Sequence, residues 1–133
     1  MKRIRGAFQA LVTAFRTLTI LPVPGREAES MASALFWFPV VGLTMGWIVY
    51  GFAGAVDWAA SQKWPEAAAF AALGGGVLLT RGLHLDGLSD WADSFGSLGD
   101  RERMLKIMKD SRVGVFGVLA LISLCLGKWI VLV

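Results

Sequence analysis

Apolar residues occur along this chain in three long runs separated by shorter polar segments. Residues 34–56 contain no charged side chain, and residues 66–85 and 113–133 contain few. A helix of about 20 residues crosses a hydrocarbon core of roughly 30 Å. The pattern therefore predicts three membrane-spanning helices, with Pro39 as the source of a kink near the start of the first.

The polar segments predict two further helices. The N-terminal segment favours a retained amphipathic helix over a cleaved signal peptide, because Arg16 interrupts its apolar stretch and no small-residue cleavage motif follows. Residues 57–66 predict a short connection in which Pro65 begins the next helix. In 94–112, Asp100 can cap a short helix lying on the membrane surface. The expected fold is an all-α, polytopic membrane bundle.

Composition supports this class of protein. The chain is 56% hydrophobic and 17% charged, with 16 glycines and 6 tryptophans and a mean hydropathy of +0.61. Glycine is common in membrane helices and tryptophan at membrane interfaces. The net charge of +3 is small and forms no basic patch interleaved with aromatic residues, so nucleic acid is not an expected partner. Cys125 is the one cysteine, which excludes a disulfide framework within the chain.

Basic residues are distributed unevenly among the polar segments. The N-terminal part and the segment after residue 86 are rich in them, whereas the 57–66 connection holds only Lys63. The positive-inside rule therefore predicts that the N-terminus and the segment after residue 86 are cytoplasmic and that the 57–66 connection is outside. The expected location is the cell inner membrane. We expect residues 1–133 to form a single membrane domain. Because three spans rarely enclose a polar site, a longer chain or a homo-oligomer is also expected.

An acidic cluster follows the second apolar run in the sequence HLDGLSDWAD, residues 84–93. On a helix, Asp86, Asp90 and Asp93 lie at i, i+4 and i+7 and share one stripe. Their mutual repulsion is relieved by a divalent cation, and hard carboxylate oxygens favour Mg²⁺, Mn²⁺ or Ca²⁺ over zinc. A solvated acidic helix end is the alternative, but acids at a membrane face are more often functional.

A second polar cluster is KDSRVG, residues 109–114. Arg112 offers a fixed fork of donors that suits phosphate, and Ser111 adds a hydroxyl. Gly114 and Gly117 allow a backbone to approach closely, and the start of the following span would direct its first N–H groups at an anion. A basic anchor beside a span is the alternative. An acidic stripe and a basic phosphate site at one membrane face together predict phosphoryl-group chemistry.

Two nearby residues have open roles. On a regular helix, His84 lies on the side opposite the acidic stripe, where it would be an interfacial histidine. A break at a neighbouring glycine would instead allow it to act as an acid, a base or a substrate contact. Arg81 either contacts phosphate or anchors its helix.

Four segments carry a resemblance to a known family. They are RTLTILPVPG at 16–25, FPVVGLTMG at 38–46, GLHLDGLSDWADSF at 82–95 and RMLKIMKDSRVGVFG at 103–117. In this order they resemble the cobalamin synthase family, whose members are adenosylcobinamide-GDP ribazoletransferases. The resemblance covers almost the whole chain, although family members are roughly twice as long and this chain matches their N-terminal portion.

The resemblance implies a Mg²⁺-dependent membrane enzyme of cobalamin biosynthesis. Adenosylcobinamide-GDP would react with α-ribazole or its 5′-phosphate to give adenosylcobalamin or its phosphate and GMP. The implied roles are metal binding by Asp86, Asp90 and Asp93, and proton acceptance by one of these or Asp110. Ser111 and Arg112 would hold phosphate oxygens.

Two other functions remain open from the residues. CDP-alcohol phosphotransferases also release a nucleoside monophosphate at a membrane by means of aspartates and metal, but their D-x-x-D-G-x-x-A-R pattern is absent here. A cation transporter subunit would use the aspartates as a transit site. Such sites lie near the membrane midplane, whereas these aspartates are predicted at the cytoplasmic face.

Overall fold

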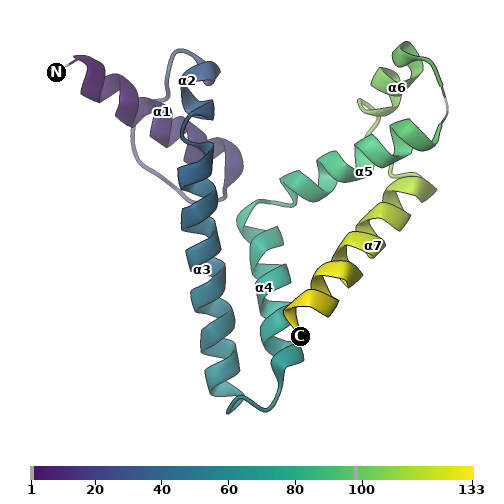
Figure 1. Ribbon diagram of the computed structural model, residues 1–133. Helices are drawn as coiled ribbons and strands as arrows, with labels where there is room; N and C mark the ends of the chain where they lie inside the picture. The colour runs from purple at the N-terminus through teal and green to yellow at the C-terminus, as the bar shows by residue number, and fades with distance from the viewer. Residues whose placement is uncertain (1, 98) are drawn as a thin grey trace. The chain divides into compact units, whose positions relative to one another are not determined.

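The computed structural model describes residues 2–97 and 99–133, and every regular element in these ranges is a helix (Figure 1). The helices are α1 (Lys2–Leu18), α2 (Met31–Leu35), α3 (Phe38–Ala59), α4 (Pro65–Leu79), α5 (Leu83–Gly96), α6 (Arg101–Ile107) and α7 (Val115–Leu132). The chain divides into two compact units, Met1–Arg81 and Gly82–Val133. The predicted all-α membrane fold is confirmed.

Within the described residues, two helices, α3 and α7, are long and apolar enough to cross a membrane. The count rises to three if α4 and α5 together form one broken span. With 15 residues, α4 alone extends only about 22 Å, which is short of the roughly 30 Å hydrocarbon core. The three predicted apolar runs are therefore helical, but the second does not form one continuous span.

Two helix boundaries differ from the prediction. The first span begins at Phe38, after the separate short helix α2, so Pro39 lies in the first turn of α3 and does not kink it. The helix predicted over 66–85 ends at Leu79. Arg81 and Gly82 then adopt left-handed conformations, with φ of 54° and 72°, which a right-handed helix cannot contain.

The break before α5 places the aspartates on a helix of their own. Two other local predictions are confirmed. Pro65 is the first residue of α4, and the Asp100 carboxylate caps α6 by accepting from the Arg103 N–H at 2.9 Å.

The first unit has its small core where α1, α2 and α3 meet. Ala14, Ala34 and Val41 are fully buried there, one from each helix. The segment after α1 also contacts α4, because the Ile20 N–H donates to the Leu79 carbonyl at 2.8 Å. That bond satisfies a carbonyl that the end of α4 would otherwise leave without a partner.

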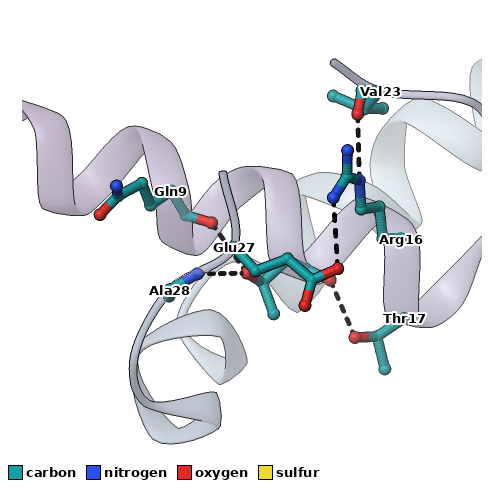
Figure 2. A network of polar contacts seen from close by, with 7 residues as sticks. Gln9, Arg16, Thr17, Val23, Glu27 and Ala28 are labelled. Atoms are coloured by element: carbon teal, nitrogen blue, oxygen red, sulfur yellow. Dashed lines mark hydrogen bonds and ion pairs between the residues drawn. The ribbon is translucent and has the colours of Figure 1, made fainter. Parts of the chain in front are cut away.

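Polar contacts fold the segment that follows α1 back over that helix (Figure 2). The Arg16 guanidinium donates to the Val23 carbonyl at 3.1 Å and pairs with Glu27 at 3.2 Å. The buried Thr13 hydroxyl accepts the Ala28 N–H at 2.8 Å. The Arg16–Glu27 pair is exposed, so we attribute more of the stability to the buried Thr13 contact.

We expect Thr13→Val to release this segment. Valine keeps the shape of threonine but leaves the Ala28 N–H without its acceptor, which costs about 1–2 kcal/mol. Trypsin cleavage after the exposed Arg26 should therefore become about tenfold faster, measured as release of the N-terminal fragment. Thr17→Val removes an exposed hydroxyl and is the matched control, for which we expect no change. Equal cleavage of the two variants would contradict this role for Thr13.

Candidate active site at the α5–α7 contact

The second unit brings the acidic helix α5 against the start of α7. Asp86 is exposed in the first turn of α5, where an acid interacts favourably with the helix dipole. Asp90 follows one turn later and is half-buried. Residues four apart on a helix have Cβ atoms about 6 Å apart, so these carboxylates face the same side as neighbours.

Asp93, the third acid of the stripe, contacts the backbone of α7. Its two carboxylate oxygens accept the N–H groups of Gly114 at 2.7 Å and Gly117 at 2.8 Å. Gly114 is the N-cap residue of α7 and has no side chain that could cap the helix. The sequence predicted that the start of this span would bind an anion. In the structure, the anion at that position is the carboxylate of Asp93.

Small residues allow the two helices to approach this closely. A Cβ atom on Gly117 would collide with the Asp93 carboxylate and the Ser89 hydroxyl, and a Cβ atom on Gly96 would collide with the Phe116 ring. The predicted close backbone approach at Gly114 and Gly117 is therefore present, and the group that approaches is α5. Interfaces of this kind are common between membrane helices.

The loop before α7 contains an ion pair. Arg112 donates to both oxygens of Asp110, with its closest nitrogen 2.7 Å away. These hydrogen bonds hold the pKa of the Asp110 carboxyl below its ordinary value and raise the pKa of Arg112. The pair is thus fully charged at neutral pH and is lost only in acid, as the pH falls through the lowered pKa of Asp110.

The geometry of this pair bears on two predicted roles. A carboxylate with a lowered pKa is a weaker base, so the pairing favours orientation of Arg112 over proton acceptance by Asp110. The Arg112 side chain is 87% exposed, and Ser111 beside it is also exposed. Both can therefore reach a ligand.

The other predicted site residues are exposed near the start of α5. His84 is the second residue of that helix. Arg81 lies just before it in the left-handed conformation. Neither side chain makes a hydrogen bond or an ion pair within the described ranges, and their roles remain predictions.

The three predicted metal ligands differ in what their carboxylates contact. Among residues 2–97 and 99–133, no three His, Cys, Asp or Glu side chains form a group that could hold a metal ion. Both oxygens of Asp93 are directed at α7, which leaves Asp86 and Asp90 as neighbouring hard-oxygen donors. Such a pair fits Mg²⁺, which proteins often hold through one or two carboxylates together with substrate phosphates and water.

Sequence reasoning missed Ser89, which is 2% exposed at the contact with α7. Its hydroxyl has no hydrogen-bond partner in the described part of the chain. The available signal was its position one turn before Asp93 on the same stripe, combined with the three-residue spacing of Gly114 and Gly117.

The chain is thus a helical membrane protein in which an acidic helix packs against the helix that follows an arginine-bearing loop. The model of the cobalamin-5-phosphate synthase family matches residues 10–133. The chain belongs to this family, which confirms the resemblance that the four sequence segments carry.

Named relatives agree with this assignment. Adenosylcobinamide-GDP ribazoletransferase of Chlorobaculum parvum is 60% identical over 92% of this chain. The proteins of the same name from Chlorobaculum tepidum and a Roseiflexus species are 59% and 46% identical over 92% and 87% of it. The chain spans about half the length of these relatives. The matched part is 47% of each Chlorobaculum protein and 43% of the Roseiflexus protein. No solved structure matches the chain significantly.

Proposed function

We propose that this chain takes part in the transfer of a corrinoid phosphate group from adenosylcobinamide-GDP to α-ribazole or its 5′-phosphate, with release of GMP. The observation that carries this proposal is the joining of the acidic and basic motifs in one unit. Asp93 on α5 accepts hydrogen bonds from the Gly114 and Gly117 N–H groups, and the Asp110–Arg112 pair is separated from Gly114 only by Val113. The names of the relatives support the choice of substrates.

In the proposed reaction, residues of α5 and of the loop before α7 have separate roles. A hydroxyl of the ribazole attacks the phosphorus that stays on the corrinoid, a new P–O bond forms, and the bond to GMP breaks. The attacking hydroxyl loses its proton to a carboxylate of α5, for which Asp90 is the candidate because it is half-buried and makes no hydrogen bond recorded in the described residues. Arg112, oriented by Asp110, holds phosphate oxygens, and the exposed Ser111 hydroxyl adds a donor.

Magnesium is part of this proposal. Asp86 and Asp90 are its proposed ligands, whereas Asp93, which the sequence predicted as a third ligand, has both carboxylate oxygens hydrogen-bonded to α7. A bound Mg²⁺ ion would offset negative charge on the pyrophosphate and the departing GMP. Arg81 and His84 are exposed beside the first turn of α5, where we propose that they contact the substrate.

The proposed setting is the bacterial inner membrane, with the N-terminus and the α5–α7 loop in the cytoplasm. The excess of Lys and Arg in those segments supports this orientation. The proposed partners are the two substrates and the lipid bilayer, with a homo-oligomer as the means of enclosing the site.

The test is GMP release from the chain in lipid vesicles with adenosylcobinamide-GDP, α-ribazole and Mg²⁺. Release that requires all three would support the proposal. Comparing α-ribazole with α-ribazole 5′-phosphate in the same assay would then identify the acceptor. The absence of both GMP release and Mg²⁺-dependent binding of adenosylcobinamide-GDP would overturn it. Mg²⁺ binding that no nucleotide affects would favour the transporter alternative.

A further inference from the structure

Asp93 differs from the other two acids of its stripe in what it contacts. Its carboxylate bridges two N–H groups in the first turn of α7, those of Gly114 and Gly117. A helix begins with N–H groups that lack partners, and a nearby side-chain oxygen normally caps them. Because the N-cap residue Gly114 has no side chain, α7 takes its cap from a residue more than twenty positions earlier in the chain.

The tight packing around the Asp93 carboxylate is a second observation, separate from its hydrogen bonds. A Cβ atom on Gly114 would lie 2.5 Å from an oxygen of Asp93, and one on Gly117 would collide with both Asp93 and Ser89. Ser89 is itself 2% exposed, with a hydroxyl that makes no hydrogen bond in the described residues. A side chain at either glycine would therefore displace the Asp93 carboxylate, which is half-buried between the helices.

The position of the basic loop depends on this contact. Asp110, Ser111 and Arg112 are separated from Gly114 only by Val113, so fixing Gly114 to α5 fixes the end of the loop that carries them. The Asp110–Arg112 pair is exposed and local, and exposed pairs hold a loop only weakly. The two half-buried hydrogen bonds of Asp93, which join separate helices, are thus the stronger restraint.

We propose that Asp93 is a positioning residue. Its carboxylate fastens the start of α7 to α5 and so sets where Arg112 lies relative to Asp86 and Asp90. The structural part of this inference stands on the contacts alone, whereas its effect on turnover rests on the function proposed above. The two parts are tested by separate measurements.

The structural part is tested by hydrogen exchange of the Gly114 and Gly117 amides in lipid, without substrate. Asp93→Ala removes both acceptors and should speed exchange at these two amides by about tenfold or more. Asp93→Asn keeps the side-chain shape and one acceptor, so it folds even if the alanine variant does not, and should give a smaller increase. Asp86→Ala, on the same helix, should change neither amide. Unchanged exchange in both Asp93 variants, or an equal increase in Asp86→Ala, would overturn the proposal.

The positioning part is tested by replacing the contact with a covalent bond. The variant carries Asp93→Ala, which removes the contact, and Cys125→Ala, which removes the native thiol. A disulfide is then introduced by Ser89→Cys and Gly117→Cys, because the Ser89 hydroxyl lies beside the position of a Gly117 Cβ atom. Oxidation to the disulfide should restore GMP release that Asp93→Ala has lost, and reduction should remove it again. A metal ligand could not be replaced in this way, so a failure of oxidation to restore release would overturn the positioning role.

The two proposals fail in different ways. A wild-type chain that releases no GMP would count against the proposed function, and the exchange experiment would still decide whether Asp93 fastens α7 to α5. Normal release together with unchanged exchange in the Asp93 variants would count against the positioning role alone.

Discussion

Asp90→Asn should lower the rate of GMP release by about a thousandfold or more, while the protein remains folded in the membrane. Asparagine has the same shape as aspartate but carries no charge and is a very poor proton acceptor. Loss of a positioned general base costs typically 10²–10⁴ in rate, and loss of a metal-binding carboxylate adds to this. Because Asp90 is half-buried in the middle of α5 and its amide analogue has a similar helix propensity, the helix itself should persist.

The measurement is initial-rate GMP release from equal amounts of lipid-reconstituted protein, with circular dichroism to verify the helix content. Asp57→Asn makes the same chemical change near the end of α3, in the other unit, and should leave the rate unchanged. Full activity of Asp90→Asn would refute its role in the reaction. A rate partly recovered at high Mg²⁺ would assign Asp90 to metal binding, whereas a rate that Mg²⁺ does not change would assign it to proton transfer.

Gly117→Ala should lower the stability of the α5–α7 contact by about 3 kcal/mol. The added methyl group would occupy the space of the Asp93 carboxylate and the Ser89 hydroxyl. Forcing a methyl group into a packed contact costs about 1–3 kcal/mol, and displacing the carboxylate also weakens its hydrogen bonds to the Gly114 and Gly117 N–H groups. The helix propensity of alanine offsets about 1 kcal/mol of this.

The matched control is Gly127→Ala, which makes the same change in the same helix at a position where a Cβ atom meets nothing within 4 Å. We expect this variant to be as stable as the wild type or slightly more so. Thermal unfolding in detergent, followed by circular dichroism, measures both. Equal stability of Gly117→Ala and Gly127→Ala would show that the α5–α7 packing is looser than in the structure.

Much of the fold could be predicted from the sequence because its causes are local. The length of an apolar run determines whether a helix can cross a membrane, and this length was enough to predict α3 and α7 as spans. The cap at Asp100 and the helix start at Pro65 depend on residues within one turn. The family could also be recognised, because four motifs in a fixed order are specific even without coordinates.

The break between α4 and α5 could not be predicted in this way. Residues 66–85 are apolar enough for a continuous helix, and Gly82 alone is compatible with one at a cost of about 1 kcal/mol. The left-handed conformation of Arg81 is unfavourable for a residue with a side chain. It persists only where the surrounding structure compensates for it, which no local pattern reveals.

Residue patterns alone were enough to predict the class of protein, the approximate helices and the candidate site residues. These patterns placed three aspartates on one helical stripe, and by periodicity the three are equivalent. Only the tertiary structure distinguished them: Asp86 and Asp90 remain available to a ligand, whereas Asp93 caps α7. The reason is that a capping carboxylate needs backbone N–H groups with free hydrogen-bonding capacity within reach. The N–H groups that Asp93 caps, those of Gly114 and Gly117, lie more than twenty residues away along the chain. Contacts over that separation depend on how two helices pack, which helical periodicity does not encode.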